Sequence, residues 1–178
     1  MKPSGFNESL DLWKTPERVA LVTSIDENDK AHVITVSWFT RVSFEPPMFA
    51  IAVGQSRSMH NLINQSKEFV LAIPGEDIAQ AVLGCGKRGG NLEDRFDKYN
   101  LKVMPADKIK SPLIKNCQAN YECVVKDTLD VGDHTLFIGK VKASWMNEQP
   151  VHNLLIAGDE PGYEIVAESG PYKLGYLK

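Results

Sequence analysis

The loop Gly54-Gln55-Ser56-Arg57-Ser58 combines residue types that suit a bound anion. It lies between an apolar run and the start of a helical pattern, so it precedes a helix N-terminus, where unpaired N–H groups and the helix dipole stabilise negative charge. Two serine hydroxyls and a guanidinium add donors, and the guanidinium can bind two phosphate oxygens at once. The loop therefore predicts a site for one phosphate, or two at most. An ordinary strand-to-helix turn, with a serine cap and an exposed arginine, explains the same residues equally well.

A second cluster, Thr35-Val36-Ser37-Trp38-Phe39-Thr40, alternates small hydroxyl residues with bulky apolar ones at the end of an expected strand. Hydroxyls and backbone amides there can contact the polar edge of a flat heterocycle, while Trp38 or Phe39 supplies apolar surface. A strand with its hydroxyls outside and its aromatic rings inside would give the same pattern. Taken alone, the cluster favours the structural interpretation.

The histidines differ in their sequence context. His134 follows an aspartate at an expected turn, which is typical of an exposed hairpin histidine but also suits a residue beside a binding site. The other three, His32, His60 and His152, have no spacing that resembles a set of metal ligands. We expect no metal site.

The three cysteines form no Cys-x-x-Cys pair, and an odd number cannot all pair within one chain. Free thiols in a reducing compartment are the simplest interpretation. Cys85, between two glycines, is either an exposed redox thiol or a small buried hydrophobe. Cys117 and Cys123 are six residues apart on an expected strand, so alternation predicts that both point to the same side of the sheet, into the core.

Several strands and one helix must position these residues. Residues 19–24 and 32–38 predict a β-hairpin around the turn 26–30. Residues 44–53 hold two prolines and then a continuous apolar run, which indicates a strand buried on both faces. A helical period begins near Ser58, the expected N-cap, and residues 69–73 form the next expected strand.

The second half of the chain predicts two short helices, a long hairpin and a tail. Residues 76–84 form the first helix, closed by Gly84, and a loop leads to a second helix over 91–99, opened by Asn91. Alternation over 119–123, the turn 131–133 and the run 134–145 predict a second hairpin. The C-terminal stretch lacks strong periodicity, and we expect a strand and a tail there.

Composition and strand content indicate one domain over residues 1–178, mainly β with short helices, forming a closed or nearly closed antiparallel barrel. Hydrophobic residues make up 43% of the chain and charged residues 24%, which is typical of a packed core. The net charge is −3 and basic residues do not cluster, so we expect no nucleic-acid partner. No long apolar segment is present, and we expect a cytoplasmic protein without a membrane span.

The order of these segments resembles the flavin reductase-like family. Residues 24–73 resemble the family's opening hairpin, its Pro-Pro turn and its Ser-containing loop before a helix. The segment Leu129-Asp-Val-Gly-Asp-His-Thr-Leu-Phe-Ile-Gly-Lys-Val141 resembles the late hairpin with its Gly-Asp-His sequence, and residues 91–101 resemble an Arg-Phe-containing helix. The resemblance spans roughly residues 19–142, although residues 85–96 lack a Ser-Gly-Arg-Asp run seen in related electron carriers.

The resemblance implies an FMN-binding split β-barrel of antiparallel Greek-key type that forms a homodimer, with each FMN near the subunit interface. It implies that His134 lies near the flavin face and the nicotinamide, as the candidate catalytic residue. It also implies a flavin ring bordered by strand-end residues, a phosphate held by the loop and a nearby Arg-Phe pair. These cofactor-binding candidates are Thr35, Val36, Ser37, Trp38, Ala52, Val53, Gly54, Ser56, Arg57, Ser58, Arg95 and Phe96.

The activity that the resemblance implies is NAD(P)H-dependent flavin reduction, with FMN as cofactor and NADH or NADPH as electron donor. An electron-acceptor protein or a monooxygenase is then a candidate partner. Two alternatives stay open at this point. One is a flavoredoxin-like carrier that keeps FMN bound and exchanges electrons with protein partners, and the other is a non-catalytic flavin-binding module.

Overall fold

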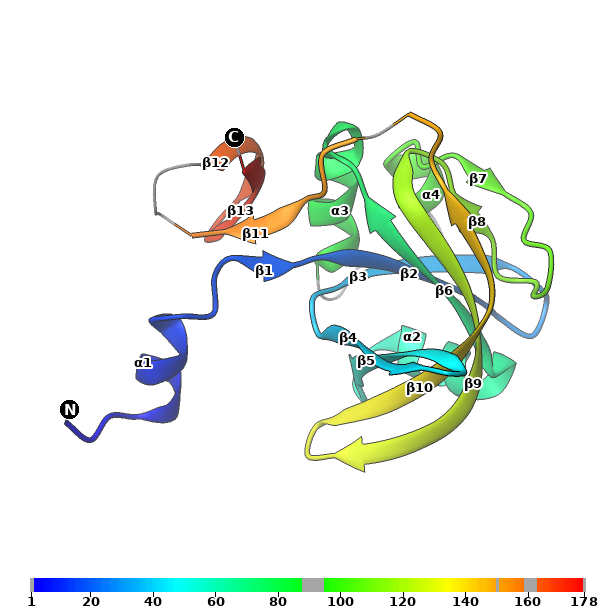
Figure 1. The fold of residues 1–178 in the computed structure, drawn as a ribbon, viewed down its shortest axis with the longest axis horizontal. Coiled ribbons are helices and arrows are strands. Elements are labelled where there is room, and N and C mark those ends of the chain that lie inside the picture. Colours follow the sequence, from blue (N-terminus) through cyan, green and yellow to red (C-terminus); the bar gives the residue numbers. More distant parts are fainter. Residues whose placement is uncertain (1, 88–94, 150, 159–162, 178) are drawn as a thin grey trace.

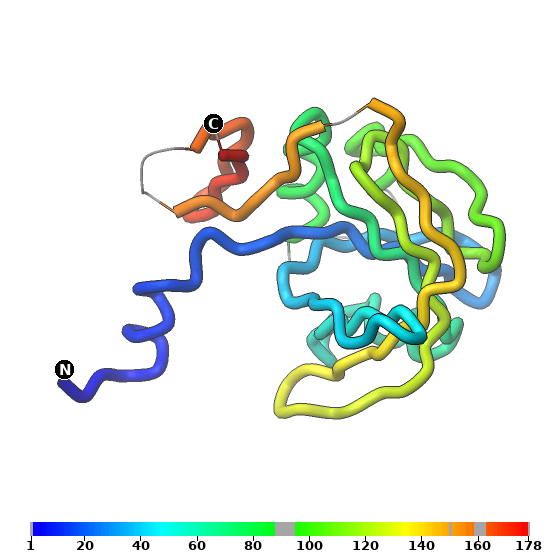
Figure 2. Tube along the Cα trace, in the orientation of Figure 1, coloured from blue at the N-terminus to red at the C-terminus, as the bar shows by residue number. Residues whose placement is uncertain are grey.

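A computed structural model describes residues 2–87, 95–149, 151–158 and 163–177 of the chain. The structure is mainly β, as the sequence predicts, with short helices, a seven-stranded sheet, a four-stranded sheet and a two-stranded sheet of residues 103–104 and 113–114 (Figures 1 and 2). The elements, in chain order, are α1 (Phe6–Asp11), β1 (Glu17–Arg18), β2 (Ala20–Ile25), β3 (Ala31–Val36), β4 (Phe39–Phe44), β5 (Pro47–Gly54), α2 (Ser58–Ser66), β6 (Glu68–Pro74), the 3-10 turn η1 (Glu76–Ile78), α3 (Ala79–Gly86), α4 (Arg95–Lys98), β7 (Val103–Met104), β8 (Leu113–Ile114), β9 (Cys117–Val131), β10 (His134–Met146), β11 (Leu155–Ala157), β12 (Tyr163–Ser169) and β13 (Tyr172–Leu177).

The main sheet has seven strands in the order β3-β2-β6-β9-β10-β5-β4, and every pairing is antiparallel. The first hairpin, β2 with β3, is confirmed: Ala20 pairs with Val36 and Ile25 with Ala31. Its turn is closed by the backbone N–H of Asp26, which donates to the carbonyl of Lys30 at 2.9 Å. The sheet curls without closing, because among the described residues its edge strands β3 and β4 pair with no further strand of this sheet, and the fold is a split barrel.

The strand expected over residues 44–53 is confirmed as β5, but two details of that prediction are wrong. A separate edge strand, β4, precedes it and pairs with it. In addition, Phe49 and Ala52 are only half-buried, so β5 is not covered on both faces. The barrel is open beside these residues, and an open barrel leaves part of one face without a packing partner.

The second hairpin, β9 with β10, is confirmed and turns at Gly132, whose φ of +59° suits glycine. Cys117 and Cys123 are both buried, as expected, but they do not share one side. Cys117 belongs to the core cluster under α3, and Cys123 to the cluster under α2. The register of β6 with β9 shifts between Ile73 and Pro74, and such an irregularity reverses the alternation of side chains.

The C-terminal residues form more than the expected strand and tail. Strands β11, β12 and β13 join β1 in a second, four-stranded sheet with the order β1-β11-β13-β12. The hairpin β12–β13 turns at Ser169–Pro171. Figure 1 shows this small sheet beside α3, on the side of the molecule that holds both termini.

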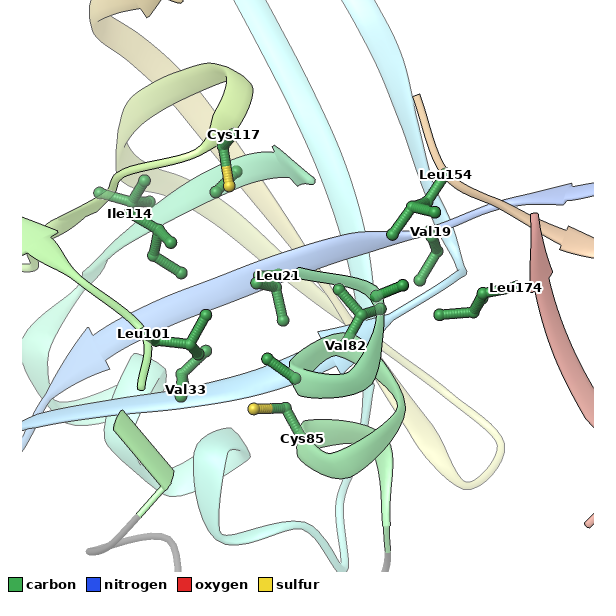
Figure 3. Close-up of a cluster of buried hydrophobic side chains, with 14 of the residues drawn as sticks. Val19, Leu21, Val33, Val82, Cys85, Leu101, Ile114, Cys117, Leu154 and Leu174 are labelled. Atoms are coloured by element: carbon green, nitrogen blue, oxygen red, sulfur yellow. The ribbon is translucent and has the colours of Figure 1, made fainter. Parts of the chain in front are cut away.

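The helices cover the two core clusters. Figure 3 shows Val82 of α3 between Leu21 of β2 and Leu174 of the small sheet, while Cys85 of α3 points toward Val33 and Leu101 in the same cluster. The helix runs to Gly86, past the expected end at Gly84, so Cys85 lies within the helix and not in a loop.

The residues that begin and end the other helices also differ from expectation. Arg57, not Ser58, is the N-cap of α2, and no side-chain hydrogen bond caps that helix. The expected start of the next helix at Asn91 lies outside the described residues, and the described helix is α4. Within the described part of the chain, no helix is long and apolar enough to cross a membrane.

Candidate functional site

The ends of three strands of the main sheet surround a cavity of about 290 Å³, here called the strand-end cavity. It forms where β3 ends, β5 ends and β10 begins. The cavity is lined by Ile34, Thr35, Val36, Ser37, Trp38, Ala52, Val53, Gly54, Arg57, His134 and Tyr172. Nine of the candidate residues from the sequence therefore meet in one place.

Backbone pairing brings these distant segments together. In the β5–β10 ladder, Gly54 lies opposite His134. The backbone N–H of Ala52 donates to the carbonyl of Trp38 at 2.8 Å, which places the residues after β3 against the end of β5. Hydroxyl groups from residues 35–38 and small apolar residues of β5 thus share one cavity.

His134 and Trp38 form an aromatic pair at the wall of this cavity. Their ring centroids are 4.7 Å apart and the rings are tilted by 39°. Nδ1 of His134 lies 2.7 Å from the Asp133 carboxylate, and the His134 side chain is only 24% exposed while that of Asp133 is 93% exposed. The histidine is therefore held by its neighbours over the cavity and is not a freely exposed hairpin residue.

The loop of residues 54–58, the candidate phosphate site, contributes one side chain, that of Arg57, to the wall of the strand-end cavity. Arg57 is half-buried, and its Nη2 donates to the carbonyl of Gly86 at 3.3 Å. Ser56 and Ser58 flank it but are exposed and are not part of the cavity wall. Their hydroxyls stay at the rim, next to the first turn of α2, where backbone N–H groups and the helix dipole favour an anion.

A second cavity of about 420 Å³, here called the hairpin cavity, adjoins the first between α3 and the hairpin β12–β13. The two cavities share Thr35, Ser37, Arg57 and Tyr172. The Thr35 hydroxyl donates to the carbonyl of Val82, which ties β3 to α3. The residues that line this cavity are Val19, Thr35, Ser37, Arg57, Val82, Leu83, Gly86, Lys87, Ile156, Ser169, Gly170, Pro171, Tyr172 and Leu174.

Two candidates from the sequence lie away from both cavities. Arg95 is buried, and its guanidinium donates to the carbonyls of Val33, Cys85 and Lys87 at 2.8–3.1 Å. Phe96 packs against the core cluster under α3. Arg95 therefore stabilises the fold here, because a cation beside the last carbonyls of α3 stabilises the C-terminal end of that helix. This helix end is part of the wall of the hairpin cavity.

The electrostatics of the two cavities favour an anionic ligand. Their described linings contain Arg57 and Lys87 but no aspartate or glutamate. Burial raises the pKa of Glu17, a half-buried carboxyl of β1, and the hydroxyl of Ser37 partly offsets this shift. Burial also raises the pKa of Cys85 to about 12, so this thiol stays protonated and does not suit redox chemistry.

These residues fit a flat, phosphate-bearing heterocycle. Trp38, Ala52 and Val53 offer apolar surface, and Thr35 and Ser37 offer hydroxyl groups at the same wall. The guanidinium of Arg57, at the border of both cavities, can bind a phosphate. A metal centre has no such support, since no group of three or more metal-binding side chains occurs among the described residues.

Tyr172 is the main contributor that the sequence analysis missed. It starts β13, is 61% exposed and lines both cavities. The Ser-Gly-Pro sequence before it is a turn signal that could have located a hairpin here. No sequence pattern, however, places that hairpin opposite residues 35–38.

Comparisons with known proteins identify the family of this chain. An uncharacterized protein of Archaeoglobus fulgidus is 39% identical over 126 residues, which are 71% of this chain and 70% of that protein. The NADH-dependent flavin reductase StyB of Pseudomonas fluorescens is 29% identical over 140 residues, 78% of this chain and 75% of that protein.

Among solved structures, the styrene monooxygenase flavin reductase SMOB of Pseudomonas putida S12 is similar, with a TM-score of 0.72 and 27% identity. The similarity covers 85% of this chain and 92% of that one. The family profile described as "Flavin reductase like domain" matches residues 12–161, so it contains the strand-end cavity except Tyr172 and ends before β12. On this evidence, the chain belongs to the flavin reductase like domain family.

Proposed function

We propose that this protein binds FMN and works as an NAD(P)H-dependent flavin oxidoreductase, in which a hydride passes from a reduced nicotinamide to the flavin. One observation carries the proposal: the two strand ends, 35–38 and 52–54, meet His134 and Arg57 around a single cavity. The family supports flavin chemistry, and the cavity offers a ring-binding wall and a phosphate-binding cation.

In this proposal each residue has a binding or orienting task. Thr35 and Ser37 hold the polar edge of the ring, while Ala52 and Val53 pass along its face. Arg57 binds the phosphate, with Ser56 and Ser58 as donors at the rim. A bound flavin supplies the redox chemistry, since it can accept a hydride and later release its electrons.

His134 is the residue we assign to the nicotinamide. Nδ1 of its ring lies 2.7 Å from the Asp133 carboxylate and the ring packs against Trp38, so both neighbours orient the ring at the cavity wall. A ring oriented in this way can position a second flat ring against the flavin. No acid–base group is required for such a transfer.

The proposed binding site and the named relatives also indicate the cofactor, the electron donor and the acceptor. FMN is favoured over an unphosphorylated flavin by Arg57, and the donor is NADH or NADPH. A relative is named as NADH-dependent, and a structural neighbour as the flavin reductase of a monooxygenase. We therefore propose a monooxygenase or another electron-acceptor protein as the physiological partner, a homodimer as the assembly and the cytoplasm as the location.

A flavoredoxin-like electron carrier is the second candidate, and a measurement of nicotinamide oxidation separates the two. Purified protein with FMN is mixed with NADH, and in parallel with NADPH, while the absorbance of the reduced nicotinamide is followed. A protein-dependent decrease with either nucleotide supports the reductase. Bound FMN that neither nucleotide reduces would exclude it and leave the carrier or a binding module.

The phosphate assignment predicts that Arg57→Ala weakens FMN binding by roughly ten- to a hundredfold. A charge-assisted contact to phosphate contributes about 1.5–3 kcal/mol, and each tenfold change in Kd corresponds to about 1.4 kcal/mol. Riboflavin, which has no phosphate, should bind the variant and the parent equally. Flavin fluorescence titration measures both ligands.

The matched control is Arg41→Ala, which removes an exposed arginine of β4 that lines neither cavity. It should leave both affinities unchanged. Equal losses of FMN and riboflavin in Arg57→Ala would place the phosphate elsewhere.

A further inference from the structure

The hairpin β9–β10 carries His134 at the place where it leaves the body of the protein. Residues 126–133 are all exposed, and Figure 1 shows this end of the hairpin reaching past the rest of the main sheet. A hairpin end with few buried contacts opens locally at a small cost in free energy. The role proposed for His134, however, needs its ring to stay at the wall of the strand-end cavity. One anchor for the start of β10 is the backbone N–H of Gln55, which donates to the carbonyl of Asp133 at 3.0 Å.

A side-chain network of His60, Thr135 and Asp130, here called the Thr135 network, supplies a second anchor. Thr135 follows His134 in β10, so its side chain points to the opposite face of the strand, and it is 3% exposed. Its Oγ1 lies 2.6 Å from Oδ1 of Asp130 and 2.9 Å from Nε2 of His60. The network thus joins both strands of the hairpin to α2.

The donors and acceptors of the network have one order. The Asp130 carboxylate only accepts, so the single hydroxyl proton of Thr135 is donated to it. The hydroxyl oxygen then accepts from Nε2–H of His60, which places a proton on Nε2 in both the neutral and the charged ring. Removal of the Thr135 hydroxyl therefore breaks two hydrogen bonds, and bonds linked in this way strengthen one another in a buried place.

His60 ties the network to the loop that holds Arg57. It lies in the first turn of α2, and its backbone N–H donates to the carbonyl of Arg57 at 2.9 Å. Its ring also packs edge-to-face against Phe137, with the ring centroids 5.5 Å apart. The backbone of Gly54 lies between His134 and Arg57, since a methyl group there would be 3.5 Å from Nε2 of the first and 3.6 Å from Cγ of the second. The network and Gly54 together set the spacing between His134 and Arg57.

We propose that His60 and Thr135 are positioning residues, which fix His134 and the loop of Arg57 relative to each other. This inference rests on the proposed function, which assigns His134 to the nicotinamide and Arg57 to the phosphate. None of the three network residues belongs to the described lining of either cavity, so the network acts through His134 and Arg57. A shift of about an ångström in a group that orients a reacting ring can slow the reaction by roughly a hundredfold.

Two substitutions at one position separate the hydrogen bonds of Thr135 from its packing. Thr135→Val keeps the branched shape and removes the hydroxyl, whereas Thr135→Ser keeps the hydroxyl and removes a methyl group. With saturating NADH or NADPH, we expect Thr135→Val to reduce bound FMN about tenfold more slowly than the parent, and Thr135→Ser to stay within about twofold of it. Anaerobic stopped-flow absorbance measures both rates. Equal slowing in the two variants would assign the effect to packing and overturn the proposal.

A double-mutant cycle tests whether the network acts through His134. In the His134→Ala background, Thr135→Val should slow flavin reduction by less than about a further twofold, because the group that the network positions is already absent. A further loss of about tenfold in that background would mean that the two residues act independently, and it would overturn the proposal. Urea denaturation of each variant checks that every rate belongs to folded protein.

Flavin affinity tests the link to Arg57 without any need for turnover. Thr135→Val should weaken FMN binding by about threefold or more and leave riboflavin binding unchanged, since only the phosphate uses the loop of Arg57. An unchanged ratio of the two affinities would overturn this link. Asp130→Ala changes an exposed residue at the end of the network and gives the same test should Thr135→Val fail to fold. Asp127→Ala, which removes another exposed carboxylate of β9, is the matched control and should change neither affinity.

The ring protons of His60 test the network itself. Nitrogen NMR of the histidine rings, assigned with His60→Ala, should show the His60 proton on Nε2 in the parent and in Thr135→Ser. In Thr135→Val, that proton should exchange faster with water. A neutral His60 ring with its proton on Nδ1 in the parent would overturn the network.

The reductase activity and the positioning role can fail separately. If neither nucleotide reduces bound FMN but Thr135→Val still lowers the affinity for FMN relative to riboflavin, the reductase proposal is wrong and the positioning of Arg57 stands. If the parent oxidises NADH or NADPH and Thr135→Val does so at the same rate, the positioning role is wrong and the reductase proposal stands.

Discussion

His134 is the residue whose surroundings separate a functional from a structural interpretation. It lies against Trp38 and opposite Gly54, at the wall of the strand-end cavity. We predict that His134→Ala slows reduction of bound flavin by roughly ten- to a hundredfold, because a shift of a stacked ring by about an ångström can cost that much. The affinity for FMN should stay within about threefold, or about 0.7 kcal/mol. Anaerobic stopped-flow measurements with NADH and NADPH follow the bleaching directly.

The control for this variant is His152→Ala, which removes a histidine that stacks on Tyr176 and lines neither cavity. It should reduce flavin at the parental rate. If His134→Ala also reduces its flavin as fast as the parent with both nucleotides, His134 has no part in the transfer.

At the scale of elements, the C-terminal end of α3 depends on Arg95. Its guanidinium joins the carbonyls of Val33, Cys85 and Lys87, and thus ties β3 and α3 to the start of α4. We predict that Arg95→Ala lowers the free energy of unfolding by about 3 kcal/mol, since three carbonyls lose a charged donor in a buried place. Urea denaturation measures the change.

The matched control is Arg18→Ala, which removes an exposed arginine of β1, because exposed charges contribute little to stability. It should change the free energy of unfolding by less than about 0.5 kcal/mol. If Arg95→Ala also lowers the free energy of unfolding by less than about 0.5 kcal/mol, water replaces the guanidinium in the variant. The end of α3 then does not depend on Arg95.

At the scale of the whole molecule, the two sheets face each other across the cavities, and Tyr172 of the small sheet lines both. A ligand in these cavities should therefore stabilise both sheets together. At FMN concentrations of about a hundred times Kd, we expect the free energy of unfolding to rise by about 2.7 kcal/mol. Removal of the flavin by dialysis should reverse the gain.

Hydrogen exchange locates that stabilisation. Protection of amides should increase on FMN binding in β3 and β5, and also in the hairpin β12–β13. Protection that increases in the main sheet alone would show that the flavin makes no contact with the hairpin cavity.

Local patterns were enough to predict both hairpins and to single out the loop before α2, but not the edge strand β4 or the small sheet. Alternation and turn residues located both hairpins, and a helix-initiating loop after an apolar run singled out Arg57. The resemblance to a family added His134 and the residues at the ends of β3 and β5. The hairpin predictions succeeded because hairpin pairing depends mainly on residues close in sequence.

Only the tertiary structure decided which of these residues meet. It placed Arg95 in the core and Tyr172 at the cavities, although the sequence analysis assigned the first to the site and gave the second no role. It also moved Cys117 and Cys123 to different core clusters through one irregularity in the ladder. The two cavities bring β13 and the end of β3 together although these segments are more than a hundred positions apart, and this depends on how two sheets pack, a property that no local pattern encodes.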